Sequence, residues 1–111
     1  MFNPFEKPLD LSEFVELKHL LDEDGIEYEE QTRNGGMQLC IPDIESFSTV
    51  HNNENRSISV ICTPYSYGGS LGLLEVYAPG LNTGVEGYLS ASEMIEYVKD
   101  TLNGISRGSC G

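Results

Sequence analysis

Residues 57–77 read Ser-Ile-Ser-Val-Ile-Cys-Thr-Pro-Tyr-Ser-Tyr-Gly-Gly-Ser-Leu-Gly-Leu-Leu-Glu-Val-Tyr, and this stretch decides the fold. Its first seven residues are rich in β-branched side chains, which favours a central strand. Residues 71–77 predict the strand that pairs with it, and the Pro, Tyr and Gly residues at 64–70 suit the turn between them. The centre of the chain is therefore expected to form a sheet.

Towards the N-terminus the same alternation of apolar and polar residues returns twice. Residues 26–30 and 37–41 alternate around Asn34-Gly35-Gly36, which predicts a β-hairpin. Residues 42–56 are rich in Asn, Asp and Ser and predict a loop with at most a short helical turn. On the other side, residues 85–89 predict either a short last strand or an extended lead into a helix.

The segment before the hairpin predicts an amphipathic helix over about residues 11–24. Asp10 is spaced to cap its first turn, with Glu13 reaching back in a capping box. Gly25 can end the helix in the left-handed conformation, which lets Ile26 fold back onto Leu21 in a Schellman motif.

A second helix is predicted at the C-terminal side of the sheet. Ser90 and Glu93 have the spacing of a capping box, apolar residues recur at three- and four-residue steps to Leu102, and Asn103-Gly104 supplies a stop. The predicted fold class is α+β, with an antiparallel sheet of about four to five strands packed against an N-terminal and a C-terminal helix (α-β-β-β-β-α).

Composition limits the size of the core and the class of partner. With 111 residues, of which 39% are hydrophobic, the chain can enclose one core. We therefore expect a single domain at 1–104, including an arm at 1–8, and a flexible tail at 105–111. The 18 acidic residues against 6 Lys and Arg give a net charge of −12, which argues against direct binding to nucleic acid or an anionic membrane.

The start of the chain and its apolar runs predict a cytoplasmic location. No apolar run approaches the roughly 20 residues needed to span a bilayer. Residues 1–8 lack the basic and apolar regions of a secretory signal. Three cysteines are an odd number for a disulfide framework, so reduced thiols are expected.

The residues that most often carry catalysis do not form a recognisable pattern. The cysteines and histidines lack the close spacings of zinc sites, so no metal and no cofactor is expected. Ser70 lacks the G-x-S-x-G frame of a strained nucleophile, and no basic residue lies between Arg56 and Lys99 to bind nucleotide phosphates. Glu75 and Glu86 could act as an acid–base pair, but exposed strand glutamates are common. We expect a protein that is not an enzyme.

An acidic stretch from Asp10 to Glu30 holds half of the carboxylates of the chain and one lysine, Lys18. Such a surface could occupy a basic nucleic-acid groove of another protein, or could be a solvated face that keeps the protein soluble. Negative charge at the end of a helix opposes its dipole, so helix stability alone would not select it. The candidate partner-binding residues are Asp22, Glu23, Asp24, Glu27, Glu29 and Glu30.

A second candidate is the turn Tyr65-Ser66-Tyr67-Gly68-Gly69. Two large amphipathic rings on a glycine-rich turn are typical of binding hot spots, so Tyr65 and Tyr67 join the candidate partner-binding residues. The alternative interpretation is a hairpin turn whose tyrosines cover the edge of the sheet.

Over residues 58–97 the chain resembles small uncharacterised acidic accessory proteins of bacteriophages and prophages of Gram-positive bacteria. The resemblance rests on the apolar strand, Tyr67-Gly68, residues 72–75 (Gly-Leu-Leu-Glu) and residues 85–91 (Val-Glu-Gly-Tyr-Leu-Ser-Ala). It implies a compact α+β domain in the host bacterial cytosol and supplies no catalytic residue. By analogy it points to inhibitors of host nucleic-acid enzymes, including anti-CRISPR and other anti-defence proteins.

We therefore expect a small acidic binding protein, an inhibitor of a host defence or nucleic-acid-processing protein, with a basic host protein as its partner. One alternative is a small-ligand-binding or sequestering protein that uses the Tyr-Gly turn. Another is a phage structural or accessory subunit. The sequence does not give the oligomeric state.

Overall fold

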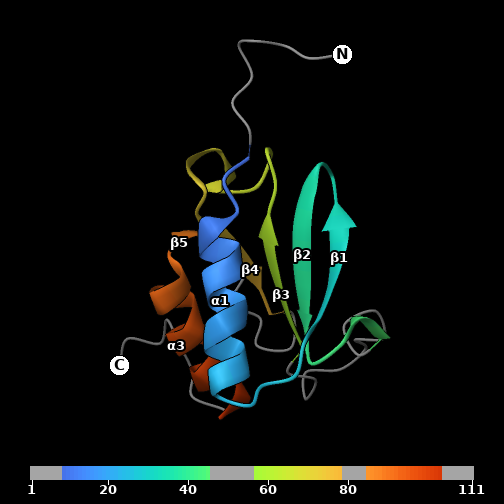
Figure 1. The fold of residues 1–111 in the computed structure, drawn as a ribbon, viewed down its shortest axis with the longest axis vertical. Coiled ribbons are helices and arrows are strands. Elements are labelled where there is room, and N and C mark those ends of the chain that lie inside the picture. Colours follow the sequence, from blue (N-terminus) through green and yellow to red (C-terminus); the bar gives the residue numbers. More distant parts are fainter. Residues whose placement is uncertain (1–8, 46–56, 79–84, 104–111) are drawn as a thin grey trace.

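The computed structural model describes residues 9–45, 57–78 and 85–103. They form a five-stranded antiparallel sheet and two longer helices, and the strands lie in the sheet in chain order, as Figure 1 shows. The predicted α+β class, with the sheet packed against an N-terminal and a C-terminal helix, is confirmed. The elements are α1 (Ser12–Glu23), β1 (Glu29–Arg33), β2 (Gly36–Ile41), β3 (Ile58–Cys62), β4 (Leu74–Tyr77), β5 (Val85–Leu89) and α3 (Ala91–Leu102).

Several predicted segments lie outside the described residues. They are the arm at 1–8, most of the loop at 42–56, and the tail at 105–111. His51 and Cys110 belong to these segments.

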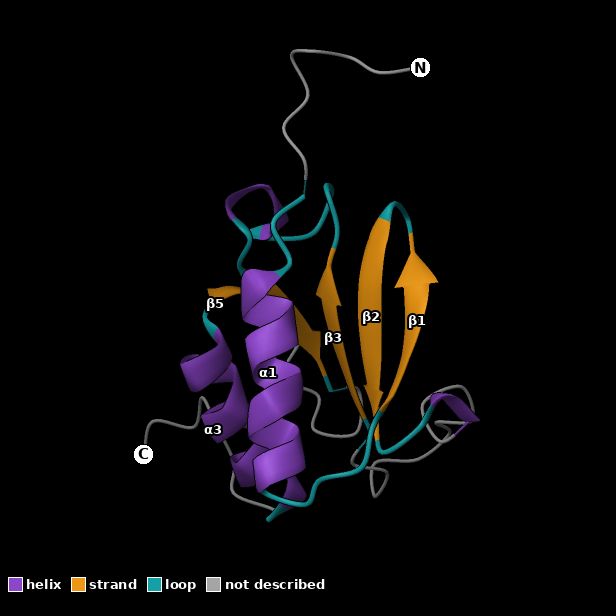
Figure 2. Cartoon of the chain, in the orientation of Figure 1, coloured by secondary structure: helices purple, strands orange, loops and turns teal. Residues whose placement is uncertain are grey.

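The core lies between one face of the sheet and the two helices. Helices α1 and α3 pack against each other on the same side of the sheet (Figure 2). Leu39, Val60 and Val76 are aligned across β2, β3 and β4, and all three are fully buried in one cluster with Phe14 and Met94 of the helices. Burying each of these large side chains contributes about 1.5–3 kcal/mol, so this face holds the layers together.

The opposite face of the sheet carries a chain of polar side chains. The side-chain amide of Gln31 donates to Gln38 Oε1 at 2.7 Å, and Gln38 Nε2 donates to Ser59 Oγ at 2.7 Å. Gln38 and Ser59 are only 2% and 6% exposed. Because each buried amide and hydroxyl has a partner, the network fixes these side chains across three strands.

Two predicted helix ends are confirmed. At the end of α1, Gly25 has a φ of +67°, and the N–H of Ile26 donates to the carbonyl oxygen of Leu21 at 2.9 Å, which is the Schellman closure. At the start of α3, Ser90 and Glu93 form the capping box: Glu93 N–H donates to Ser90 Oγ, and Ser90 N–H donates to Glu93 Oε1.

The capping box predicted for α1 is wrong. Asp10 Oδ1 accepts hydrogen bonds from the backbone and hydroxyl of Ser12 instead. Glu13 does not reach back to Asp10, because its Oε1 accepts the backbone N–H of Ala91 at 2.7 Å. Glu13 therefore caps the first turn of α3 rather than that of its own helix.

Two strand starts also differ from the prediction. The strand expected at 26–30 is β1 and begins at Glu29, because Ile26 is used to close α1. The strand expected at 71–77 is β4 and begins at Leu74, because Gly69–Leu71 forms a 3₁₀ turn between two glycines with positive φ. Residues 85–89 form a strand rather than only a lead into the helix.

Candidate functional site

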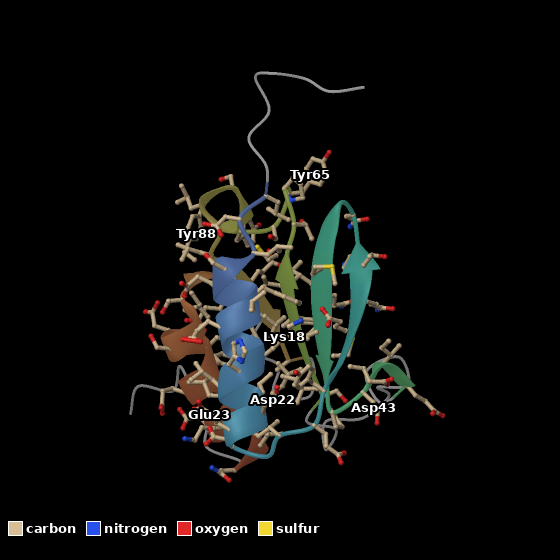
Figure 3. The ribbon with its side chains drawn as sticks, in the orientation of Figure 1. Lys18, Asp22, Glu23, Asp43, Tyr65 and Tyr88 are labelled. Carbon is tan, nitrogen blue, oxygen red and sulfur yellow. The ribbon has the colours of Figure 1, made fainter. Side chains whose placement is uncertain are left out.

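An open groove lies where α1 ends, and carboxylates from separate segments surround it. Its volume is about 780 Å³. It is lined by Asp22 at the end of α1, Glu27 and Glu29 at the approach to β1, and Asp43 after β2. We call these four residues the anionic groove, and Figure 3 shows Asp22 and Asp43 at this end of the molecule.

Hydrogen bonds to neighbouring groups position two of the groove carboxylates. Glu29 Oε1 accepts the backbone N–H of Ile44 at 3.0 Å, which ties the start of β1 to the bend after β2. Burial and a hydrogen bond to Asp22 raise the pKa of Tyr28, so its phenol stays protonated and continues to donate. Two of the four negative charges of the groove are therefore held in position.

The six predicted acidic residues are all exposed, but they do not form one continuous cluster. Asp22, Glu27 and Glu29 line the groove. Asp24 turns towards α3, where its Oδ2 lies 3.5 Å from Lys99 Nζ. Glu30 lies 3.1 Å from Lys18 Nζ. Ion pairs thus partly neutralise Asp24 and Glu30, and Glu23 sits at the end of α1 outside the groove.

Sequence reasoning missed Asp43 as a groove residue. Asp43 lies two residues after the end of β2, and the register of the hairpin places Glu29 opposite Cys40, three positions before Asp43. The turn signal Pro42-Asp43 was visible in the sequence, but its position beside the end of α1 depends on long-range packing.

The Tyr-Gly turn forms a second exposed surface. Four large side chains with apolar area are well exposed here: Tyr65 (85%), Tyr67 (59%), Leu71 (67%) and Tyr88 (60%). We call them the aromatic end. Tyr88 comes from β5, so the aromatic end joins this strand to the turn.

Close backbone contacts hold the aromatic end. The N–H of Tyr67 donates to Glu75 Oε1 at 2.8 Å, and the N–H of Tyr88 donates to the carbonyl oxygen of Tyr67 at 3.1 Å. A Cβ on Gly87 would stand 2.3 Å from the Cβ of Tyr67, so only glycine fits there. Tyr88 has a φ of +61°, an uncommon conformation for a bulky residue, next to an irregularity in the β4–β5 pairing.

The anionic groove and the aromatic end are far apart. Figure 3 shows Tyr65 and Tyr88 at one end of the long axis and Asp22 and Asp43 towards the other. The predicted site residues therefore belong to two separate surfaces rather than to one site.

A smaller hollow of about 280 Å³ lies on the sheet face turned away from the helices. The buried Gln38 and Ser59 line it together with Ile61, Glu75 and Tyr77, and Arg33 stands at β1. Since Glu75 also accepts the N–H of Tyr67, this hollow adjoins the Tyr-Gly turn.

The two cysteines that the structure describes are buried, whereas its described imidazole is not. Burial raises the pKa of both Cys40 and Cys62, which keeps them as unreactive thiols. His19 is exposed on α1. Over residues 9–45, 57–78 and 85–103, no three His, Cys, Asp or Glu side chains are placed to hold a metal ion.

Comparison of the chain with protein-family models, curated proteins and solved structures gave no match. In the part of the chain that the structure describes, no helix is both long enough and apolar enough to cross a membrane.

Proposed function

We propose that this protein is a small acidic binding protein whose anionic groove takes Lys and Arg side chains of a basic partner protein. The observation that carries the proposal is the convergence of Asp22, Glu27, Glu29 and Asp43, from three segments of the chain, on one open groove. The Glu29 hydrogen bond to Ile44 keeps one of these charges in place before any partner arrives. A preformed negative surface speeds and orients the approach of a basic protein.

Several contacts are needed for useful affinity. One exposed ion pair contributes only about 0.2–1 kcal/mol, so a single lysine on the groove would bind weakly. A nucleic-acid-binding surface supplies many Lys and Arg residues at spacings that match phosphates. Carboxylates on a folded surface can compete with nucleic-acid phosphates for the same Lys and Arg residues.

This chemistry leads to a narrower proposal for the class of partner: a host defence or nucleic-acid-processing protein, inhibited in the bacterial cytosol by a phage-encoded protein. The resemblance of residues 58–97 to acidic accessory proteins of phages and prophages supports it, and anti-CRISPR proteins are one kind of inhibitor that would fit.

The test is affinity capture from a lysate of a Gram-positive bacterium, with mass spectrometry of what binds. The groove variant carries Asp22→Asn, Glu27→Gln and Glu29→Gln. The control variant carries Glu16→Gln, Glu86→Gln and Glu96→Gln, three exposed carboxylates outside the groove, so both variants lose the same charge. Glu30 is left unchanged because Lys18 already pairs with it.

Wild type and control are expected to retain the same basic protein, and the groove variant to lose it. Retention should fall as salt shortens the Debye length from about 30 Å at 0.01 M to about 8 Å at 0.15 M. Equal capture by all three proteins, or binding that is insensitive to salt, would reject the electrostatic mechanism.

The aromatic end supplies a separate contact in this proposal. Exposed tyrosines on a rigid backbone bind largely through buried ring area, which salt affects little. Tyr65→Ser with Tyr67→Ser should therefore weaken capture by the same amount at low and high salt. Because the two surfaces lie apart, a partner that responds to both sets of variants must be large or present in two copies.

A second candidate function is the binding of a small ligand beside the Tyr-Gly turn, and the hollow on the open sheet face favours it. A ligand there would raise the melting temperature by mass action. In a thermal-shift screen of metabolites, Tyr77→Ala should abolish the shift, whereas Tyr67→Ala should preserve it because Tyr67 lies outside the hollow. A shift that survives Tyr77→Ala would place the ligand elsewhere.

A further inference from the structure

Strand β1 forms one edge of the sheet. Among the residues that the structure describes it pairs with β2 alone, and all five of its residues are exposed. Figure 1 shows β1 at the outer margin of the sheet. Proteins often block such edges with a proline or a bulge, but β1 contains no proline and its register with β2 is regular over Glu29–Arg33. Its outer backbone groups can therefore pair with another strand.

The hairpin turn determines which backbone groups face outward. Asn34 and Gly35 have φ values of +46° and +83° and join Arg33 directly to Gly36. The pair that flanks a two-residue turn of this kind exchanges hydrogen bonds within the hairpin. By alternation, Glu30 and Thr32 direct their N–H and C=O groups away from β2.

These outward groups match a second copy of the same strand running antiparallel. When the twofold axis passes beside Gln31, Glu30 lies opposite Thr32 of the second copy, and four backbone hydrogen bonds can form. The side chains then place Glu29 opposite Arg33 of the second copy, twice by symmetry. The five residues of β1 read Glu-Glu-Gln-Thr-Arg. In an antiparallel pair of two such strands, the negative first residue of each strand therefore faces the positive last residue of the other.

The neighbouring registers are worse. An axis beside Glu30 sets two Glu30 side chains against each other, and an axis beside Thr32 forms no Glu–Arg pair at all. Like charges directly opposite destabilise a strand pair, whereas opposite charges stabilise it. The charge pattern therefore selects the register centred on Gln31.

Arg33 has the charge available for such a pair. Lys18 and Lys99 are both engaged in ion pairs, whereas Arg33 makes none with the residues described in the structure. Glu29 uses Oε1 for the Ile44 N–H, and its Oε2 can meet the guanidinium of the second copy.

We propose that this protein forms a twofold dimer by pairing β1 with β1 of a second copy, which joins two five-stranded sheets into one of ten strands. Glu29 belongs to both the edge and the groove, so the dimer brings two anionic grooves close to the shared axis. The dimer does not depend on the proposed function, and in it Arg33 of the second copy offsets the Glu29 charge that each groove presents in the monomer.

The test is sedimentation equilibrium of the full chain over a concentration series at physiological ionic strength. Wild type is expected to show a monomer–dimer equilibrium. Glu29→Arg alone and Arg33→Glu alone each place like charges opposite one another in the dimer. Each is expected to weaken self-association about tenfold or more.

Exchange of the charges provides the strictest check. Glu29→Arg combined with Arg33→Glu restores both pairs and should restore the dimer. An equimolar mixture of the two single variants should form a heterodimer, because one copy then presents two arginines and the other two glutamates. Thr32→Pro, which removes an outward N–H without changing charge, should abolish dimers while thermal melting confirms that it folds.

Three results would overturn the proposal. The first is a wild-type protein that stays monomeric over the whole series. The second is a dimer that persists in both single charge variants and in Thr32→Pro. The third is a mixture of the single variants in which no heterodimer forms.

Discussion

The Glu13 carboxylate supports the first turn of a helix that begins 78 residues later in the chain, and Glu13→Ala tests that support. Its Oε1 lies 2.7 Å from the N–H of Ala91, the length of a charge-assisted hydrogen bond. Ala91 is 1% exposed, so water does not readily replace the lost acceptor. A hydrogen bond to a charged group contributes about 1.5–3 kcal/mol, so we expect a loss of about 2 kcal/mol.

A double-mutant cycle separates this bond from other effects of the substitution. Ala91→Pro removes the donor, and proline is well tolerated at the first helical position. Ser90 before it has a ψ of 169°, the extended conformation that a following proline requires. In urea unfolding, Glu13→Ala should cost about 2 kcal/mol in the wild-type background and within about 0.5 kcal/mol in the Ala91→Pro background.

Glu16→Ala serves as the matched control, because Glu16 lies on the same helix and is exposed. Its cost should stay within about 0.5 kcal/mol. If Glu13→Ala costs the same with and without the Ala91 N–H, the hydrogen bond does not contribute and the reasoning is refuted.

Three further predictions concern backbone fit, pH and strain. Gly36→Ala should lower the free energy of unfolding by about 1–3 kcal/mol or more, because the new Cβ would stand 2.1 Å from the Cys62 carbonyl oxygen. Gly25→Ala meets open space and should lower it by only about 1–2 kcal/mol, because of its φ of +67°. Urea unfolding of the two variants measures the difference. Hydrogen bonds from the backbone and the side chain of the N-cap residue lower the pKa of folded Glu93, so the stability it contributes is present above its unfolded pKa, near 4.5, and is lost as the pH falls through its folded pKa; in thermal melts wild type should be more stable than Glu93→Gln above about pH 4.5, and the two should converge as the pH falls to about 3. Tyr88→Gly should leave the melting temperature unchanged or raise it, because relief of a positive φ, worth about 1–2 kcal/mol, outweighs a glycine entropy cost of about 0.5–1 kcal/mol; a clear fall in calorimetry would contradict this.

The parts of the fold that short-range chemistry determines were predictable from the sequence. The Asn34-Gly35 turn, the closure of α1 at Gly25 and the capping box at Ser90 each depend on residues within about five positions of one another. Alternation of apolar residues also predicted the strands, because one sheet face is buried against helices.

Features that depend on tertiary packing were missed. Asp10 and Glu13 have the spacing of a capping box, yet the packing of α1 on α3 offers Glu13 a different N–H. The groove needs Asp43 beside Asp22, which no local pattern encodes. The exposed ring of Tyr88 lies beside an irregularity in the β4–β5 pairing, which the sequence of residues 85–89 does not reveal. Sequence patterns selected residues that lie on two exposed surfaces, but they did not show that the two surfaces lie apart.

Contact between α1 and α3 has a consequence for how the protein is made. The ribosome releases α1 well before α3, so the apolar face of the sheet lacks the cover of α3 during several seconds of translation. Contacts between residues as far apart in the sequence as Glu13 and Ala91 also slow the search for the native state relative to a helical protein with only local contacts. Over that interval the excess of carboxylates keeps nascent chains apart by mutual repulsion, a use of the negative charge that requires no folded surface.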